Sequence, residues 1–391
     1  MGGRTRRKSV SRKVGRLSES VIREMTRLAD LHGALNLAQG FADFPAPASV
    51  KAAAVQAIKD DYNQYAVTWG SPRLRAAISE KADWFNGIKA DPDKNVTVTC
   101  GSTEAMMASV MALADPGDEV IMFEPAYENY TPSAILAGAT PRPVTLGPGF
   151  ALDEEALKEA LNERTKLVIV NTPHNPSGKV FGRDELKVIA DLCEDFGAIA
   201  ITDEIYEHIL YDGREHVSLA TLGSMAESTV TISGVSKTYT ATGWRVGYTI
   251  ADQTLTNAIR KVHDYMTLCA PAPLQEASVS ALKLPKAFYE DLAASYQKKR
   301  DFMTKGLRDL GFEFFFPEGS YYILADFSSL SRLEDTKFAS SMTVDCGVAV
   351  VPGSSFFADP RKGRKLVRFS YSKKDSTLSS AMGKMRAYFR A

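Results

Sequence analysis

The segment TISGVSKTYTATGWRVGY, residues 231–248, places a single lysine in a turn rich in serine, glycine and threonine. Lys237 follows a short apolar run, and Arg245 comes later in the same segment. An amine becomes a nucleophile when burial or a nearby cation lowers its pKa, and it can then form a Schiff base with an aldehyde. A lone loop lysine is normally exposed to solvent. The case for a reactive amine therefore depends on the residues that accompany Lys237.

A Gly-Ser-Thr turn opens a predicted helix in CGSTEA, residues 100–105. Gly101, Ser102 and Thr103 would direct backbone N–H groups and two hydroxyls toward one point, where the helix dipole favours an anion. The same residue types are also typical of a plain helix N-cap. The segment lacks GxxxxGK[ST], so it is not a P-loop. Phosphate binding and simple capping both remain open for this turn.

Two further polar side chains follow an apolar run in TDEIYEHI, residues 202–209. A carboxylate at the end of a buried strand, such as Asp203, needs a partner. A protonated ring nitrogen would serve, and so would a structural arginine. Tyr206 could present its phenol to the same ligand.

Two prolines and a glycine mark a rigid turn in NTPHNPSGKVF, residues 171–181. Such a turn would hold Asn175 firmly as a hydrogen-bond donor. We interpret His174 as a structural or exposed histidine, because no nearby carboxylate is placed to orient it as a base. Arg368 lies in the apolar run LVRFSYS, where a buried guanidinium needs a carboxylate from the protein or from a substrate.

These groups describe one site when they are taken together. A lysine, a phosphate cradle, a carboxylate for a ring nitrogen, a phenol, an amide and a carboxylate clamp suit pyridoxal 5′-phosphate with an amino acid beside it. The cofactor would act as the electron sink, while the protein supplies orientation and electrostatics.

Apolar runs alternate with helical patterns through the part of the chain that carries these residues. Near-continuous apolar strands separated by helices predict a mostly parallel sheet covered on both faces, an α/β fold that binds ligands at the carboxyl ends of its strands. The predicted strands are 96–100, 119–125, 167–173, 198–204, 229–233 and 245–251. After about residue 285, a long helix (roughly 286–310) and a few short strands predict a smaller α+β domain.

The composition argues against several classes of binding partner. The 391 residues include 47 Lys or Arg and 47 Asp or Glu, so no net charge attracts nucleic acid or a membrane surface. No apolar run is long enough for a transmembrane helix. The four cysteines are scattered without metal-ligand or disulfide spacing, which predicts no metal and suits a reducing cytoplasm. Residues 1–16 are basic, and we interpret them as a disordered tail rather than an organelle presequence.

The chain resembles the class I/II pyridoxal-phosphate-dependent aminotransferases of fold type I, and within them the kynurenine, glutamine and methionine aminotransferase subgroup. The resemblance runs in order from about residue 20 to the C-terminus. It is carried by NLAQGFADFPAP (36–47), NQYAVTWGSPRLRAAI (63–78), TCGSTEAM (99–106), FEPAYENY (123–130), NTPHNPSGKVF (171–181), TDEIYEHILYDG (202–213), SKTYTATGWRVGY (236–248), PEGSYYILAD (317–326) and VRFSYS (367–372).

The resemblance implies a role for each residue of the cofactor site. Lys237 would hold the cofactor as a Schiff base and move the proton during the reaction, and Asp203 would keep the ring nitrogen protonated. Tyr206 and Asn175 would hydrogen-bond the phenolic oxygen, and Tyr127 would stack on the ring. The phosphate would be bound by the turn at Gly101 with Ser102 and Thr103, by Arg245, and by Tyr65 of the partner subunit.

The resemblance also implies a substrate site and an assembly. Arg368 would grip the substrate α-carboxylate, assisted by Asn175 and the backbone of Gly40. A site completed by Tyr65 of the partner subunit makes a homodimer the expected state. Many relatives carry a phosphate-binding serine three residues before the lysine, where this chain has Gly234 flanked by Ser233 and Ser236. Which serine contacts the phosphate is therefore left open.

We therefore expect a cytoplasmic aminotransferase that moves an α-amino group to a 2-oxo acid in a ping-pong cycle. Aromatic residues expected at the entrance (Phe41, Phe44, Tyr65 and Tyr127) favour an apolar, aromatic or sulfur-containing amino acid. The alternatives are an aspartate-type aminotransferase, a cysteine-S-conjugate β-lyase on the same scaffold, and a non-catalytic regulator, which the intact site residues disfavour. The expected divisions are the tail 1–16, an N-terminal segment 17–45 that contributes to the small domain and to the active-site entrance, a large cofactor-binding domain 46–284 and a small C-terminal domain 285–391.

Overall fold

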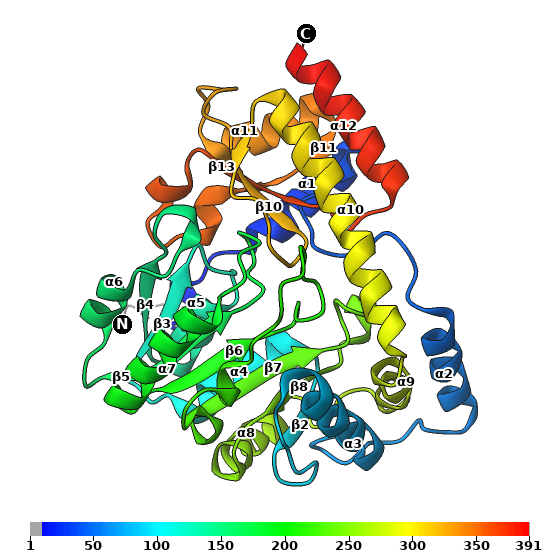
Figure 1. The fold of residues 1–391 in the computed structure, drawn as a ribbon, viewed down its shortest axis with the longest axis vertical. Helices are drawn as coiled ribbons and strands as arrows, with labels where there is room; N and C mark the ends of the chain where they lie inside the picture. Colours follow the sequence, from blue (N-terminus) through cyan, green and yellow to red (C-terminus); the bar gives the residue numbers. More distant parts are fainter. Residues whose placement is uncertain (1–9, 391) are drawn as a thin grey trace, which may run out of the picture.

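The computed structural model describes residues 10–390, and a seven-stranded sheet forms its centre (Figure 1). The strand order is β2-β8-β7-β6-β5-β3-β4. Only β8 runs antiparallel to its neighbours, so the prediction of a mostly parallel sheet is confirmed. The strands are β2 (Val96–Thr99), β3 (Glu119–Glu124), β4 (Thr140–Thr145), β5 (Thr165–Asn171), β6 (Ile199–Asp203), β7 (Thr229–Gly234) and β8 (Gly247–Ile250).

Alternate side chains of the central strands enter two different cores, as the period of two in a strand requires. Leu167 and Ile169 of β5 pack in the core that includes residues of α4, α5 and α8. Val168 and Val170 point the other way, into the core that includes residues of α6 and α7. The helices therefore cover both faces, which explains why these strands read as continuous apolar runs.

Two strand predictions need correction. The strand predicted at 245–251 begins only at Gly247, because Arg245 has a φ of 55° and lies in a left-handed turn. The strand β4 was not predicted at all. Its sequence TPRPVT contains two prolines, which cannot donate to a ladder and argue against a strand. The strand is tolerated because β4 lies at the edge of the sheet.

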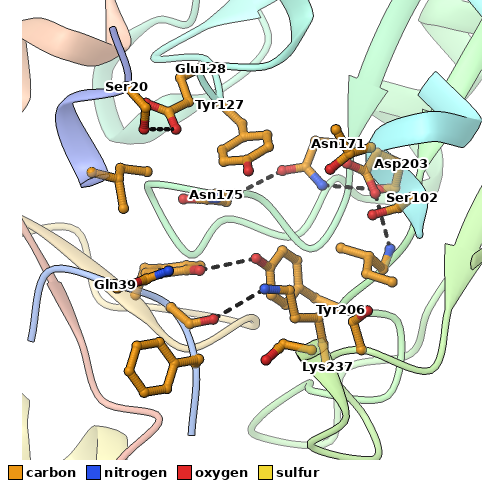
Figure 2. A pocket seen from close by; sticks show the side chains of 18 of the residues that line it. Ser20, Gln39, Ser102, Tyr127, Glu128, Asn171, Asn175, Asp203, Tyr206 and Lys237 are labelled. Carbon is orange, nitrogen blue, oxygen red and sulfur yellow. Dashed lines mark hydrogen bonds between the residues drawn. The ribbon is translucent and has the colours of Figure 1, made fainter. Parts of the chain in front are cut away.

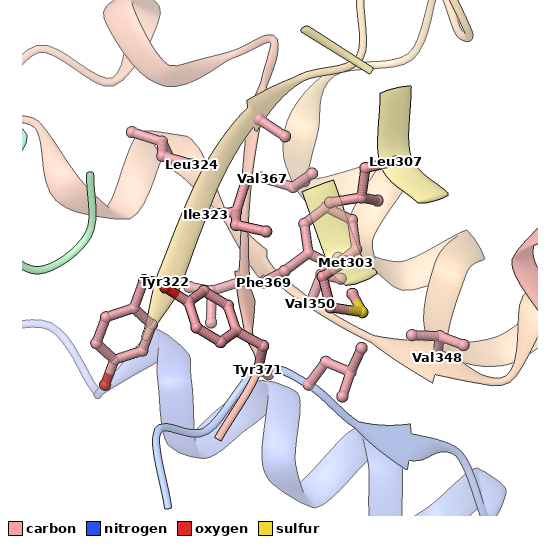
Figure 3. Close-up of a cluster of buried hydrophobic side chains, with 14 of the residues drawn as sticks. Met303, Leu307, Tyr322, Ile323, Leu324, Val348, Val350, Val367, Phe369 and Tyr371 are labelled. Carbon is pink, nitrogen blue, oxygen red and sulfur yellow. The ribbon is translucent and has the colours of Figure 1, made fainter. Parts of the chain in front are cut away.

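A second sheet lies in what we call the C-terminal layer, residues 286–390, with strand order β12-β13-β10-β9 and antiparallel pairing throughout. Figure 3 shows side chains of β10 and β13, including Ile323 and Phe369, packed with Met303 and Leu307 of α10. The predicted helix at 286–310 is confirmed as α10, which runs from beside α9 into this layer (Figure 1). The strands are β9 (Glu313–Phe314), β10 (Tyr322–Asp326), β12 (Val351–Pro352) and β13 (Leu366–Ser370).

The segment near the N-terminus joins the C-terminal layer. The strand β1 (Leu35–Asn36) pairs in parallel with β11 (Val348–Ala349), and Ile22, Met25 and Ala29 of α1 enter the core of that layer. Of the predicted basic tail, residues 1–9 lie outside the described residues, while Val14–Arg16 form a single 3-10 turn.

Twelve α-helices complete the described part of the chain, and none of them is long and apolar enough to cross a membrane. The helices are α1 (Val21–His32), α2 (Ala48–Lys59), α3 (Pro72–Lys81), α4 (Ser102–Leu113), α5 (Tyr130–Ala137), α6 (Glu154–Ala160), α7 (Arg183–Phe196), α8 (Gln253–Met266), α9 (Ala272–Leu282), α10 (Lys286–Leu310), α11 (Asp335–Ser341) and α12 (Asp375–Arg390).

Candidate active site

A cavity of about 460 Å³ opens at the carboxyl edge of the central sheet. Figure 2 shows Lys237, Tyr206, Asp203 and Asn175 around the same space. The strand ends meet there because β5, β6 and β7 are parallel neighbours: Asn171 pairs with Asp203, and Asp203 with Ile232. The predicted residues that line the cavity are Gly40, Ser102, Thr103, Tyr127, Asn175, Asp203, Tyr206, Lys237, Arg245 and Arg368.

The opposite wall comes from residues 37–43, which we call the strap. The strap leaves β1 and crosses to the C-terminal layer, where Leu37 accepts a hydrogen bond from the backbone of Ser370 at 2.7 Å. Gln39, Gly40 and Phe41 of the strap line the cavity. Gly40 leaves room for Tyr322, because a Cβ atom there would lie 1.8 Å from the Tyr322 hydroxyl.

Lys237 follows the end of β7 and turns its amine toward the strap. Its Nζ donates to the Gly40 carbonyl at 3.1 Å. Burial is the largest influence on the pKa of Lys237 and lowers it, and the positive charges of Arg368 and Arg245 act in the same direction. A larger fraction of unprotonated amine is what a nucleophilic lysine needs.

Asp203, the last residue of β6, holds a buried carboxylate without a cationic partner among residues 10–390. Its Oδ2 accepts from the Tyr130 hydroxyl at 2.8 Å, and its Oδ1 from the Ile205 backbone N–H at 3.3 Å. Burial raises the pKa of Asp203 to about 6. A protonated ring nitrogen placed against this carboxylate would restore the ionised form.

The phenol of Tyr206 and the amide of Asn175 line the same cavity as the Asp203 carboxylate. The Tyr206 hydroxyl lies 3.1 Å from that of Tyr322, and burial raises the pKa of Tyr206 well above its ordinary value. Asn175 is fixed by its backbone N–H, which donates to the side chain of Asn171 at 2.8 Å. Both side chains are therefore buried, polar and held by other residues, as the sequence predicted for ligand-binding groups.

Helix α4 begins at the cavity with its N-cap Gly101, which has no side chain to occupy the first N–H groups. Arg245 lies against this turn, with Nη2 3.4 Å from the Cys100 carbonyl and Nη1 3.1 Å from that of Thr242. A Cβ atom on Gly101 would lie 2.3 Å from Arg245 Nη2, and the φ of Gly101 is 84°. The glycine is thus required both by its conformation and by the close approach of the arginine. A helix N-terminus and a guanidinium at one point form an anion site.

The two serines that flank Gly234 differ in where they point. Ser233 donates to the carboxylate of Glu207 at 2.6 Å and is buried away from the cavity, whereas Ser236 lines it. A Cβ atom on Gly234 would lie 2.8 Å from the Val246 carbonyl, so the fold leaves no room for a serine there. Ser236 is accordingly the one of these three residues that lines the cavity.

Arg368 of β13 is 1 % exposed and has no carboxylate partner among the described residues. Its Nη1 donates to Asn175 Oδ1 at 2.8 Å and its Nη2 to the Ala38 carbonyl at 2.6 Å, while its Nε has no partner within that part of the chain. The rings of Tyr322 and Phe356 lie 4.3 and 5.1 Å from the guanidinium carbon. The interpretation in which an acidic residue of the protein neutralises Arg368 is wrong.

Three predicted or weighed residues lie outside the cavity of their own chain. Tyr65 is 82 % exposed and lies in a separate surface hollow with Tyr62 and Val67. Phe44, expected at the entrance, packs instead against Tyr296 with ring centroids 6.3 Å apart. His174 is buried, its Nδ1 lies 2.7 Å from Ser177 Oγ, and burial lowers its pKa to about 3, so its structural interpretation is confirmed.

Sequence reasoning missed several residues of the site. Tyr130 supplies the hydroxyl on Asp203, and Tyr322 lies between Tyr206 and Arg368. Ser20 donates to Glu128 at 2.6 Å across the rim, which ties the start of α1 to the turn after β3. Tyr322 lies in PEGSYYILAD and Tyr130 in FEPAYENY, but neither segment shows which distant side chain the tyrosine meets. Ser20 lies in no such segment.

A separate buried cluster supports the turn that carries Asp203 and Tyr206. Ligand atoms of Glu204, Glu207 and His216 lie within 4.8 Å of one another, a grouping that could hold a metal ion. The Lys81 amine lies 2.5 Å from Glu207, and Asn86 donates to both glutamates. The cluster therefore contains its own cation, and we assign it no metal.

Comparison with known proteins identifies the family of the chain. The model of aminotransferase class I and II matches residues 33–384. Methionine aminotransferase of Escherichia coli is 37 % identical over 96 % of this chain and 97 % of its own length. Human kynurenine–oxoglutarate transaminase 1 is 33 % identical over 93 % of this chain and 94 % of its own. The structure of N-succinyldiaminopimelate aminotransferase from Mycobacterium tuberculosis superposes with a TM-score of 0.94 at 37 % identity and covers 97 % of this chain and 100 % of that one.

The chain belongs to the class I and II aminotransferase family, with the fold-type I architecture. Members of this family use pyridoxal phosphate and transfer an amino group to a 2-oxo acid. The residues present fit the cofactor: an anion site at α4, a buried carboxylate without a cation, and a lysine with a lowered pKa face one cavity. When bound, the cofactor supplies the electron sink that the protein's side chains lack.

Proposed function

We propose that Lys237 attaches the cofactor and moves the proton at the substrate Cα. Asp203 holds the proton on the ring nitrogen, and Tyr206 and Asn175 bind the phenolic oxygen. Tyr127, half-buried at the cavity and edge-on to Tyr130, is placed to cover the ring face. The lowered pKa of Lys237 and the raised pKa of Asp203 support these roles, since burial is the largest influence on each and neither group forms an ion pair within the described residues.

The phosphate is assigned to the N-terminus of α4. Gly101 provides the turn, and the Ser102 and Thr103 groups, Arg245 and Ser236 surround the point where the phosphate would bind. The observation that supports this choice is the guanidinium of Arg245 beside uncapped N–H groups.

We propose an amino acid as the substrate, and the single observation that carries this proposal is the state of Arg368. A buried guanidinium that binds only neutral oxygens retains a charge that a carboxylate would match in bidentate fashion. It shares the cavity with Lys237, so the α-amine of a substrate held by Arg368 would face the cofactor. Asn175 assists by accepting a hydrogen bond from the guanidinium, and Gly40 of the strap forms the cavity wall.

The side chain of the substrate is proposed to be apolar, aromatic or sulfur-containing. Ile22, Phe41 and Tyr127 supply the apolar part of the cavity wall. Two of the relatives, a methionine aminotransferase and a kynurenine–oxoglutarate transaminase, have names that point to the same class of substrate, whereas the N-succinyldiaminopimelate aminotransferase is named for a substrate with further carboxylates. The amino acid would leave as a 2-oxo acid before a second 2-oxo acid takes the amine.

The assembly, compartment and divisions of the chain are also proposals. A homodimer would place Tyr65 of the partner subunit at the phosphate, which is supported by the exposure of Tyr65 beside Tyr62 and Val67. Four free cysteines support a reducing cytoplasm. The start of α10 at Lys286 supports the division between a large domain, 46–284, and a small domain, 285–391.

The test is a visible spectrum of the purified holoenzyme as single amino acids are added. Methionine, phenylalanine and kynurenine should each shift the absorption of the bound cofactor to that of its amine form, and oxoglutarate should reverse the shift. Aspartate at equal concentration should act far more weakly. A spectrum that responds to aspartate alone would contradict the proposed substrate class.

A second candidate is an aspartate-type activity, favoured by one observation. Arg23 is exposed at the rim of the same cavity and makes no ion pair within residues 10–390, so it could meet a distal carboxylate. The β-lyase alternative needs the same Lys237 chemistry but would release pyruvate from a cysteine conjugate without an added 2-oxo acid. The spectral titration, with pyruvate measured in parallel, separates these activities.

A further inference from the structure

The strap joins the cofactor side of the cavity to the substrate side. The Gly40 carbonyl accepts from Lys237 Nζ at 3.1 Å and from the Tyr321 hydroxyl at 2.9 Å, while the Ala38 carbonyl accepts from Arg368. Phe41, the next residue of the strap, adds an aromatic ring to the cavity wall. The position of that ring depends on what holds the strap from behind.

Lys373 is the residue behind the strap. It is 2 % exposed and lies in the short connection between β13, which ends at Ser370, and α12, which begins at Asp375. Its Nζ donates to the Phe41 carbonyl at 2.7 Å and to the Gln39 carbonyl at 3.4 Å, and it lies 4.0 Å from the centroid of the Phe41 ring. One ammonium group therefore binds both the backbone and the side chain of Phe41.

This contact is unusual because a buried lysine is normally paired with a carboxylate. Asp43 is nearby, but its oxygens accept from the Lys374 backbone at 2.5 Å and from the Thr377 hydroxyl at 2.6 Å. No acidic side chain in the described chain forms an ion pair with Lys373. The charge is thus directed at the strap rather than at an acid.

We propose that Lys373 is a positioning residue that fixes Phe41 as the aromatic wall of the substrate side-chain subsite, and thereby sets the KM for apolar amino acids. Lys373 does not line the cavity and acts only through the strap. The inference rests on the apolar substrate class proposed above. It assigns to Lys373 a part of substrate selectivity that is separate from the carboxylate clamp.

The charge of Lys373 makes this contact sensitive to pH. Burial lowers the pKa of Lys373 to about 8, against the opposing attraction of Asp43. Its own segment also carries Lys374 and Asp375, and Asp375 pairs with Lys299 of α10. Above pH 8 the amine loses its charge, and with it the attraction to the ring and the stronger hydrogen bonds.

The experiment compares Lys373→Met with Lys374→Met in the holoenzyme. Methionine keeps the length of the side chain but removes the charge and the donors, whereas Lys374 is exposed and meets Asp43 only through its backbone. We expect Lys373→Met to raise the KM for methionine or phenylalanine by about tenfold, with kcat within about twofold. Lys374→Met should match the wild type. Equal KM values for both variants would overturn the proposal.

Two measurements distinguish positioning from a general structural effect. Hydrogen–deuterium exchange of the strap peptide, residues 37–43, should become faster in Lys373→Met while peptides of the central sheet stay unchanged. In the wild type, the KM for these amino acids should rise above pH 8, where Lys373 loses its charge. Lys373→Arg should keep the KM of the wild type at neutral pH and should not show this rise, because a guanidinium stays charged. Loss of cofactor binding, or faster exchange throughout the molecule, would contradict the proposed role.

A double-mutant cycle tests whether Lys373 acts through Phe41. If it does, Lys373→Met should have little further effect on KM in a Phe41→Leu background, whereas independent residues would give additive effects. Additivity would overturn the proposal. If the wild-type enzyme uses aspartate alone, the proposed substrate class fails, but the exchange rate of the strap still reports whether Lys373 holds Phe41.

Discussion

The cavity has two halves that are built in different ways. The cofactor half lies on the central sheet, where Asp203 and Lys237 follow neighbouring parallel strands and Ser102 begins the helix after β2. The substrate half is assembled from the strap and from the segment 368–373, which are far apart in the sequence. The first half is positioned by backbone ladders, and the second by single side chains that hold carbonyl groups.

This difference has a mechanical consequence. The backbone at the ends of paired strands cannot shift without breaking ladder hydrogen bonds, so we expect the cofactor half to be held more firmly than the strap. Backbone hydrogen bonds hold the strap at Leu37. The carbonyl groups of residues 38–41 are held by the side chains of Arg368, Lys373, Tyr321 and Lys237, and each of these contacts can be weakened by one substitution. Variants in the cofactor half should therefore change kcat, and variants in the substrate half should change KM.

The largest effect is expected for Lys237→Ala. Because this variant removes the amine that attaches the cofactor and moves the proton, turnover should fall by about 10⁵-fold or more. The visible absorption of the lysine-bound cofactor should also disappear from the purified protein. A variant that keeps both the absorption and the turnover of the wild type would show that another group is the nucleophile.

Asp203→Asn should reduce kcat by about 10²- to 10³-fold with a small change in KM, because a buried charge loses its partner at a cost of about 2–5 kcal/mol. The measurement is steady-state kinetics with the cofactor in excess. A change confined to KM would contradict the assignment of Asp203 to the cofactor half.

The raised pKa of Asp203 also predicts how the stability of the cofactor-free protein depends on pH. Its pKa rises from 3.8 to about 6 on folding, so between these values the folded state binds a proton that the unfolded state lacks. The contribution of Asp203 to stability is therefore present below pH 4 and is lost as pH rises through 6, by about 3 kcal/mol in total. The difference between urea midpoints of wild type and Asp203→Asn should follow this change over pH 4–7. A difference independent of pH would show that folding does not raise the pKa of this carboxyl.

Arg368→Ala should act on the other half of the cavity. The loss of a buried, charge-assisted clamp should lower kcat/KM for amino acids, mainly through KM, by an amount that corresponds to about 2–5 kcal/mol of lost transition-state binding. The affinity for the cofactor should stay close to that of the wild type. Arg368→Lys is the matched control, because it keeps the charge but loses the bidentate geometry. Its kcat/KM should fall between those of the wild type and Arg368→Ala. Near-wild-type kcat/KM in Arg368→Ala would remove the clamp from the mechanism.

The two halves were not equally predictable from the sequence. Short local motifs mark the cofactor half, because the strand end and the functional side chain are adjacent: Asp203 closes β6 and Gly101 opens α4. In the substrate half, Arg368 was predicted from its charge in an apolar run, and the resemblance placed Asn175 with it, but its contact with the Ala38 carbonyl was not predicted. No local pattern reports which distant carbonyl a buried cation will meet. The same limit hid Lys373, whose sequence neighbours give no sign that its amine turns toward the strap.

The smallest effect is expected for Tyr65, which lies in neither half of the cavity of its own chain. If a homodimer brings Tyr65 of the partner subunit to the phosphate, Tyr65→Phe removes one hydrogen bond to an anion and should weaken cofactor binding by about 1–2 kcal/mol. Tyr62→Phe is the matched control, since Tyr62 lies in the same surface hollow without a predicted role. The measurement is the cofactor Kd of the reconstituted protein, with the oligomeric state determined by light scattering. Equal Kd values for both variants, or a monomer with full cofactor affinity, would mean that one chain completes the phosphate site alone.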